Sequence, residues 1–369
     1  MKVLILSVNN GQGHNSCAAA LGTAYERHGC LCVIWDALSF VSEDISRLVS
    51  NCHVKIYRYI PRSNDIGYRL SEKHPGAVFK KGSPVYGLLR NGAKKLAARI
   101  DEEGFDAVIA CHVFAAVMLT QAKELCKKEF KSAHVSTDYT CSPGVAQSNM
   151  DFYFIPNEAL RDEFAAAGVP EERIVSSGLP VGEKFFYPAD RTRAREALRV
   201  RPGESHLMVM CGSMGGGPIY ALSSELSGLA GENVRISIIC GTNGNLKKKL
   251  DKKFGGDERF RIYGYVGNIA AFMDSADLFL TKPGGLSTSE AAVKGLPMVF
   301  VNSVAGCEDH NFNFFINAGG AVSAKKNRDI AALCISLLSN EERLKGMSGA
   351  LRKCIPGNPA ENIFEAMSL

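Results

Sequence analysis

The stretch from Asp277 to Phe315 constrains the fold more than any other part of the chain. It begins with an apolar strand, Leu278 to Leu280, which runs into a Pro283-Gly284-Gly285 turn and then a helix from about Ser287 to Lys294. Glycines let a backbone approach a ligand closely, and the first turn of a helix offers unpaired N–H groups to an anion. The spacing therefore predicts a phosphate-binding turn.

Polar side chains surround this predicted turn. Glu290 lies one turn into the helix, where its carboxylate can accept hydrogen bonds from vicinal hydroxyls such as those of a ribose. A second strand, Pro297 to Val301, ends in a polar loop that holds Glu308, Asp309, His310 and Asn311. Adjacent strand ends of a parallel sheet deliver their side chains to one crevice. We interpret the stretch as a nucleotide-sugar site, and an ordinary strand–turn–helix connection without a ligand is the alternative.

The same alternation of strand, turn and helix repeats in both halves of the chain. Because crossovers between parallel strands are right-handed, it predicts an α/β protein with two parallel, doubly wound sheets. A chain of 369 residues, 46% hydrophobic and 22% charged, is long enough for two domains with separate cores. The opening residues MKVLILSV predict a strand rather than a signal peptide, and no apolar run approaches ~18 residues. The twelve cysteines are scattered without a CxxC pair, which predicts reduced thiols in a cytosolic protein.

The segments TKPGGLSTSEA, KGLPMV and AGCEDHN resemble the donor-binding signature of the glycosyltransferases that make monogalactosyl- and glucosyl-diacylglycerol, relatives of the lipid II GlcNAc transferase. The resemblance covers nearly the whole chain. It implies the GT-B fold, in which two Rossmann-like domains face each other across a cleft, and a UDP-sugar donor. We expect an N-terminal acceptor domain over 1–181, a UDP-sugar domain over 182–353, and a helix in 354–369 that crosses back to the first domain.

The resemblance places the UDP-sugar in the second domain. After the apolar strand Leu207 to Cys211, four glycines in six residues can present N–H groups to a diphosphate, with a flexible turn as the alternative. Tyr265 and Val266 would pair through their backbone with the uracil, and Cys307 stands where the family usually has glutamine, which leaves the sugar open among glucose, galactose and GlcNAc. The implied donor-binding residues are Gly212, Ser213, Met214, Gly215, Gly216, Asn243, Tyr265, Val266, Lys282, Pro283, Gly284, Gly285, Ser287, Thr288, Glu290, Glu308 and Asn311.

Near the N-terminus, strand Val3 to Val8 leads through a glycine-containing loop into a helix from about Ser16. Its GxGxxS pattern and Asp36, at the end of the next strand, approach a dinucleotide fingerprint, so an NAD-linked dehydrogenase is one alternative. In the glycolipid synthases a Gly-His pair stands at this turn, matched here by Gly13 and His14, and the resemblance implies that the histidine is the catalytic base. Because a helix start disfavours imidazolium, we expect His14 to be neutral at pH 7.

A Thr-Asp-aromatic triplet follows the strand Ser132 to Ser136, as it does in the glycolipid synthases. We expect its aspartate, Asp138, to orient the acceptor hydroxyl or support the base, and a loop-capping aspartate is the alternative. The chain departs from the family pattern just afterwards, where Cys141 to Val145 replaces the usual histidine and tryptophan. This departure leaves the acceptor open.

Positive charge is concentrated between Lys55 and Arg99, where eleven basic residues accompany two acidic ones and five Tyr or Phe rings. Such a mixture suits an anionic bilayer surface, and each nearby cation adds about 1 kcal/mol. RNA binding and a merely solvated helix face are the alternatives. We expect a peripheral contact with the inner face of the cell membrane and no nucleic-acid partner.

Together these patterns predict an inverting glycosyltransferase that moves glucose or galactose from a UDP-sugar to diacylglycerol. No two aspartates stand two residues apart, so a DxD metal clamp is missing, and we expect no cofactor and no metal. Backbone N–H groups, helix dipoles and Lys282 would instead stabilise the departing UDP. The alternatives are a UDP-GlcNAc transferase that acts on a polyprenyl-linked cell-wall precursor and a UDP-sugar sensor without catalysis.

Overall fold

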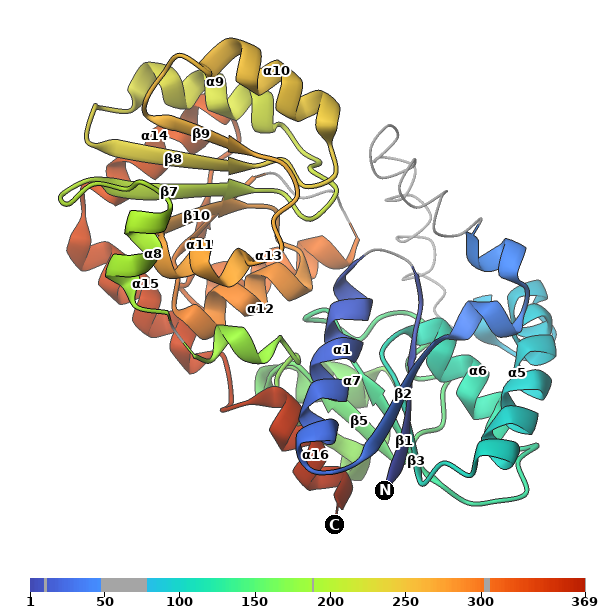
Figure 1. Cartoon of the computed structure of the whole chain (residues 1–369). Coiled ribbons are helices and arrows are strands. Elements are labelled where there is room, and N and C mark those ends of the chain that lie inside the picture. Colours follow the sequence, from blue (N-terminus) through green and yellow to red (C-terminus); the bar gives the residue numbers. More distant parts are fainter. Residues whose placement is uncertain (10–11, 48–77, 188, 302–305, 369) are drawn as a thin grey trace. The chain divides into compact units, whose positions relative to one another are not determined.

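A computed structural model of the chain describes residues 1–9, 12–47, 78–187, 189–301 and 306–368. The chain divides into two compact units (Figure 1). The first comprises Met1–Gly182, Ala305–His310 and Ile355–Leu369, and the second comprises Glu183–Val304 and Asn311–Cys354. Among the described residues, no helix combines the length and the apolar character needed to cross a membrane.

The first unit is built on six parallel strands in the order β2-β1-β3-β4-β5-β6. β1 lies between β2 and β3, so Ile5 pairs with Ile34 on one side and with Ile109 on the other. The chain leaves β1 in one direction and later returns on its other side, which makes the β1/β3 boundary a topological switch point. The strands are β1 (Lys2–Ser7), β2 (Leu31–Asp36), β3 (Ala107–Ala110), β4 (Lys131–Val135), β5 (Phe152–Ile155) and β6 (Ile174–Ser176).

Helices cover both faces of this sheet. One apolar core joins β1, β3 and β4 to the two helices α1 and α16, through Leu21, Tyr25, Ile363 and Met367. The longest of the described helices, α5, begins at Pro84 after the N-cap Ser83 and ends at Glu103, with Gly104 as its left-handed C-cap. The helices and 3₁₀ turns of the first unit are α1 (Gln12–Arg27), η1 (Ala37–Phe40), α5 (Pro84–Glu103), α6 (Val113–Lys123), η2 (Glu158–Leu160), α7 (Arg161–Ala166), η3 (Glu171–Arg173) and α16 (Pro359–Ser368).

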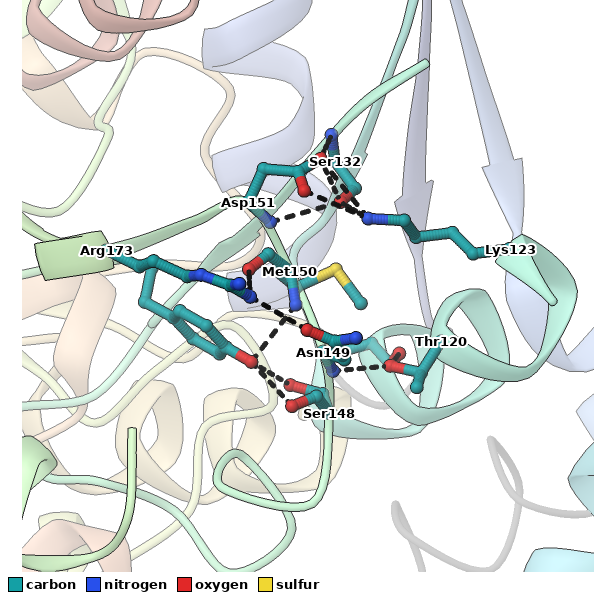
Figure 2. A network of polar contacts seen from close by, with 10 residues as sticks. Thr120, Lys123, Ser132, Ser148, Asn149, Met150, Asp151 and Arg173 are labelled. Atoms are coloured by element: carbon teal, nitrogen blue, oxygen red, sulfur yellow. Dashed lines mark hydrogen bonds and ion pairs between the residues drawn. The ribbon is translucent and has the colours of Figure 1, made fainter. Parts of the chain in front are cut away.

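The connection between β4 and β5 is held by a polar network (Figure 2). Asp151 accepts hydrogen bonds from the Ser132 amide and hydroxyl at 2.8 and 2.7 Å, and Lys123 Nζ lies 3.1 Å from its carboxylate. Burial alone would raise the pKa of Asp151, but the bonds from Ser132 and Lys123 outweigh it and hold the pKa below its usual range. Arg173 donates to the carbonyl of Met150 and to the Asn149 side chain. The network fixes β4, whose carboxyl end carries site residues.

The second unit also has six parallel strands, in the order β12-β11-β10-β7-β8-β9. Renumbered from its own first strand, this is the 3-2-1-4-5-6 order of Rossmann domains, with the switch point between β7 and β10. Nearly every residue of the central strands is buried, as expected for a sheet covered on both faces. The strands are β7 (Ser205–Met210), β8 (Val234–Ile239), β9 (Phe260–Tyr263), β10 (Leu278–Thr281), β11 (Met298–Phe300) and β12 (Ala321–Ser323).

One core of this unit packs the sheet against α9, α10 and α14, with Leu222, Leu226, Leu250 and Leu337 among its buried side chains. Figure 1 shows α9 and α10 along one face and α8, α11 and α12 along the other. The helices and 3₁₀ turn with described bounds are η4 (Glu183–Phe185), α8 (Arg191–Ala197), α9 (Ile219–Leu229), α10 (Gly244–Phe254), α11 (Ile269–Ser275), α12 (Gly285–Lys294), α13 (Cys307–Asn317), α14 (Asn327–Leu338) and α15 (Glu341–Lys353), and the residues of α13 up to His310 are counted with the first unit.

The predicted fold class, two parallel and doubly wound sheets, is confirmed. Several element boundaries differ from the predictions, and one strand was missed. α1 begins at Gln12 rather than near Ser16, α12 begins at Gly285 rather than near Ser287, and the short strand β12 was not predicted. Most of the basic segment, residues 55–77, lies outside the described residues.

Candidate active site

His14 lies at the switch point of the first sheet. It is the third residue of α1, directly after Gly13, and α1 follows β1. The carbonyl of Cys111, which follows β3, and the hydroxyl of Thr137, which follows β4, both lie 3.0 Å from His14 Nδ1. Because β1, β3 and β4 are neighbours and parallel, their carboxyl ends bring these three residues together.

These two oxygens determine the tautomer of a neutral His14. A main-chain carbonyl has lone pairs and no proton, so it can only accept a hydrogen bond. Nδ1 must therefore carry the proton, and the Nδ1–H group donates a hydrogen bond to the Cys111 carbonyl. In that tautomer Nε2 holds the lone pair, which is the nitrogen a general base needs.

Two further histidines lie close to His14. Its ring packs edge-on against His112, with 4.6 Å between ring centroids, and His112 Nδ1 accepts a hydrogen bond from the Phe114 amide as the N-cap of α6. His134, in β4, is buried, and burial lowers its pKa to about 4, a value that includes the opposing effect of its hydrogen bond with the Ala110 backbone and a smaller lowering effect of His14. His112 and His134 are thus arranged as uncharged neighbours of the candidate base.

Asp138 stands where the predicted triplet places it, half-buried just beyond Thr137. The side chains after it are held in place, because Glu163 accepts hydrogen bonds from the Thr140 hydroxyl at 2.6 Å and from the Cys141 amide at 2.7 Å. The sequence interpretation selected Asp138 and missed Thr137. Only the order of the strands shows that Thr137 meets His14.

The loop before α1 is tied to the end of β2 by a chain of side chains. Ser7 donates to Asn15 at 2.6 Å, Asn15 to Asn9 at 2.9 Å, and Asn9 to Asp36 Oδ2 at 3.0 Å. Asp36 Oδ1 also accepts from the Leu38 amide at 3.1 Å. The carboxylate that would hold a ribose in a dinucleotide site is thus engaged within the protein, and the strand order of this unit differs from that of dinucleotide-binding domains. The geometry therefore does not favour the NAD-linked alternative.

In the second unit, the glycine loop after β7 packs tightly against the turn after β8. A Cβ atom on Gly215 would lie 2.0 Å from the Cys240 carbonyl oxygen, and one on Gly241 would lie 2.0 Å from that of Ser213. Asn243 holds the contact, since its amide donates to the Gly215 carbonyl at 2.9 Å while its Oδ1 caps α10. Gly212, Gly215 and Gly241 all have positive φ angles, which suit glycine.

The amides of this loop are only partly available to a ligand. The N–H groups of Gly215 and Gly216 donate to the Gly212 and Cys211 carbonyls, at 3.2 and 3.3 Å. Those two groups were expected to face a diphosphate, and in this structure they close the turn instead. Ser213 and Met214 form the outer part of the same loop.

The turn after β10 provides a helix start without a side-chain cap. α12 has Gly284 as its N-cap residue, and glycine has no side chain that could cap the first amides. Lys282, two residues earlier, lies against both glycine turns. A Cβ atom placed on Gly212 or on Gly284 would lie 3.8 Å from Lys282 Nζ. An uncapped helix start with a lysine beside it suits a phosphate, since both carry positive charge toward one point.

Side chains of α12 complete this edge of the second unit. The Thr288 hydroxyl donates to the Gly284 carbonyl at 2.9 Å. The neighbouring Ser287 side chain is half-buried. Burial raises the pKa of Glu290 to about 8, and Lys184 partly opposes this rise. At neutral pH the Glu290 carboxyl is thus largely protonated and can both donate to and accept from a diol.

The remaining predicted residues follow other strands. Tyr265 and Val266 come after β9, and the Tyr265 side chain is 69% exposed. Glu308 and Asn311 are one turn apart in α13, which places them on the same side of the helix. Gly212–Gly216, Asn243, Tyr265 and Lys282–Gly285 all follow the carboxyl ends of strands in one parallel sheet. Among the described residues, no group of three or more His, Cys, Asp or Glu side chains could hold a metal ion.

Comparison with protein families gives two matches along the chain. Residues 14–181 match the monogalactosyldiacylglycerol (MGDG) synthase family, and residues 206–348 match the glycosyltransferase family 28 C-terminal domain. Among curated proteins, the chain is 26% identical to a processive diacylglycerol beta-glucosyltransferase of Bacillus cytotoxicus, over 99% of this chain and 93% of that protein. It is 25% identical to the protein of the same name from Bacillus subtilis, over 99% and 94% of the two chains.

Solved structures share the fold. MurG of Acinetobacter baumannii superposes with a TM-score of 0.66 at 13% identity, covering 100% of this chain and 99% of MurG. A UDP co-structure of MnaA from S. aureus gives a TM-score of 0.68 at 14% identity, over 100% and 96% of the two chains. These similarities establish the GT-B fold that the sequence predicted.

Proposed function

We propose that the chain, whose residues 14–181 match the monogalactosyldiacylglycerol synthase family and whose residues 206–348 match the glycosyltransferase family 28 C-terminal domain, transfers a hexose from a UDP-sugar to diacylglycerol. The observation that carries this proposal is the similarity to diacylglycerol beta-glucosyltransferases over 99% of the chain, in which the His14 and Lys282 regions are both included. Glucose or galactose is the transferred sugar.

His14 acts as the general base. Its Nε2 takes the proton of the acceptor hydroxyl while the hydroxyl oxygen attacks the anomeric carbon. The bond from that carbon to the diphosphate oxygen breaks, and its electron pair leaves with UDP. A single displacement inverts the configuration, so an α-linked donor yields a β-glycoside. A positioned base of this kind contributes roughly 10²–10⁴-fold to the rate.

The second unit stabilises the departing UDP. The first amides of α12 and the ammonium of Lys282 meet the charge that develops on the diphosphate. Glu290 binds the ribose hydroxyls, and Glu308 and Asn311 bind the sugar. The reaction needs no metal, because these groups supply the positive potential.

The enzyme works at the inner face of the cell membrane, and its basic residues hold it there. Among the described residues of the segment, Arg90 is paired with Glu124 at 2.7 Å and Arg99 with Glu102 at 2.9 Å. The exposed residues Lys80 and Lys81, just before α5, therefore contribute more of the attraction to anionic lipid.

An activity matrix tests the proposal. Purified protein is incubated with UDP-glucose, UDP-galactose or UDP-GlcNAc, and with anionic vesicles that contain diacylglycerol, a polyprenyl-linked precursor or neither, with and without EDTA. We expect UDP release and a glycolipid product only with diacylglycerol, unchanged by EDTA. Product with the polyprenyl acceptor alone would replace the proposed acceptor, and nucleotide binding without any product would identify a sensor.

A further inference from the structure

Thr137 holds a position that the proposed reaction leaves without a role. Its Oγ1 lies 3.0 Å from His14 Nδ1, on the same nitrogen that the Cys111 carbonyl contacts at 3.0 Å. We propose that Thr137 is a positioning residue that, together with the Cys111 carbonyl, fixes His14 in the tautomer whose Nε2 faces the acceptor hydroxyl. This inference rests on the proposed function for its catalytic meaning, and its geometry is independent of the acceptor.

The fold holds both oxygens rigidly. The Cys111 amide donates to Leu6 O at 2.9 Å, which extends the β1–β3 pairing to the residue whose carbonyl meets His14. Thr137 follows β4, whose last pairing bond runs from the Ser136 amide to Phe154 O at 3.0 Å. Beyond Thr137 the chain is anchored again by Glu163, through Thr140 and Cys141. Both oxygens are therefore already in position before the reaction begins.

The arrangement matters most once His14 has taken the proton. The ring then carries a positive charge, and Nδ1–H still points at two oxygens that bear partial negative charge. The N-terminal end of α1 opposes this charge, whereas the neighbouring rings of His112, 4.6 Å away, and of buried His134 are uncharged. Among the described residues, Asp138 follows Thr137 directly in the chain, and Cys17, three residues after His14 in α1, interacts with the Cys111 side chain. The oxygens of Thr137 and of the Cys111 carbonyl stabilise the imidazolium and so offset this unfavourable effect.

Three variants of the full-length protein separate positioning from folding. Thr137→Val keeps the shape of the side chain and removes its oxygen, and Thr137→Ser restores an oxygen. Thr23→Val makes the same chemical change on the exposed face of α1, where the hydroxyl donates to the Ala19 carbonyl within the helix. Circular dichroism and UDP binding are expected to match the wild type in all three.

The first readout is the pH profile of the transfer reaction. We expect Thr137→Val to lower kcat at least about tenfold, a part of what a positioned base contributes, with the KM for the UDP-sugar unchanged. The acidic limb of its pH profile moves to lower pH, because the imidazolium has lost an acceptor. Thr137→Ser recovers most of the rate, and Thr23→Val retains all of it. A wild-type rate and profile in Thr137→Val would overturn the inference.

The second readout needs no activity. ¹⁵N NMR of the histidine side chains, with His14 assigned by comparison with His14→Gln, reports which ring nitrogen carries the proton. We expect the Nδ1–H tautomer in the wild type, in Thr137→Ser and in Thr137→Val, because the Cys111 carbonyl remains as an acceptor, and a lower titration midpoint of the ring in Thr137→Val alone. An Nε2–H tautomer in the wild type would refute the assignment. If the protein proved inactive on every acceptor, this spectrum would still test the positioning, so failure of the proposed function and of this inference are distinguishable.

Discussion

The side-chain amide of Asn243 donates a 2.9 Å hydrogen bond to the carbonyl of Gly215, while its oxygen caps α10 at the Leu246 amide. The Asn243 side chain thus joins the glycine loop after β7 to the first turn of α10. The Thr242 amide adds a second link, donating to the Ser213 carbonyl at 2.9 Å. The shape of the glycine loop therefore depends on the turn that follows the neighbouring strand β8.

Asn243→Asp tests this link, because aspartate keeps the capping oxygen and cannot donate to Gly215. We expect about 1–2 kcal/mol of destabilisation by urea unfolding, since a carboxylate oxygen then faces a carbonyl oxygen, and weaker UDP binding by calorimetry. Asn268→Asp is the matched control. Asn268 is the N-cap residue of α11 and makes no capping bond, so its replacement is expected to leave stability and UDP binding nearly unchanged. Equal effects of the two substitutions would contradict the link.

Gly215→Ala is expected to disrupt the loop. Its methyl group would lie 2.0 Å from the Cys240 carbonyl oxygen, and the residue has a φ of 60°, so both space and backbone conformation oppose alanine. We expect loss of at least about 2 kcal/mol of stability and of most UDP affinity. Gly228→Ala, in α9 with open space around it, should be neutral or stabilising. Unaltered UDP binding by Gly215→Ala would show that the loop tolerates another shape.

Glu290 makes stability depend on pH. Its pKa is about 8 in the folded protein, well above the value of about 4.3 expected when unfolded. Between these values the folded state binds more protons than the unfolded state, so this group lowers stability as pH rises. Glu290→Gln should match the wild type near pH 4.5 and exceed it at pH 8, by on the order of 2–4 kcal/mol. Urea unfolding at both pH values measures this, and a gap that does not widen with pH would refute the assignment.

A charge reversal at Lys80 and Lys81 tests membrane attachment. The double variant Lys80→Glu/Lys81→Glu should bind anionic vesicles at least about tenfold less tightly, because each cation near such a surface contributes about 1 kcal/mol. Lys248→Glu/Lys249→Glu changes net charge equally on the exposed side of α10, in the other unit. Co-sedimentation with vesicles compares the two. If both variants lose binding equally, net charge and not this segment governs attachment.

Local patterns were sufficient to predict the fold class and most elements. Apolar strands followed by glycine turns identify β7, β8 and β10. β12 was not predicted, because a strand of three residues is too short to show a periodic hydrophobic pattern. The starts of α1 and α12 were misjudged by a few residues, since glycine and asparagine at those positions read as loop.

The candidate site was predictable residue by residue but not as an arrangement. His14 is recognisable from its motif, whereas the Cys111 carbonyl and Thr137 act on it only because β3 and β4 follow β1 in the sheet order. Strand order is a long-range property that no local pattern encodes. Likewise, the count of glycines after β7 predicts available amides, yet two of those amides close the turn.

α16 has a consequence for how the protein is made. Its residues Ile363 and Met367 belong to the same core as Leu21 of α1, and His28, just beyond α1, stacks on Phe364 with ring centroids 3.9 Å apart. Lys131 of β4 also donates to the Met367 carbonyl at 2.9 Å. During synthesis, the apolar face of the unit that carries His14 stays uncovered until α16 leaves the ribosome. A nascent chain stalled before Pro359 should accordingly be a preferred client of chaperones.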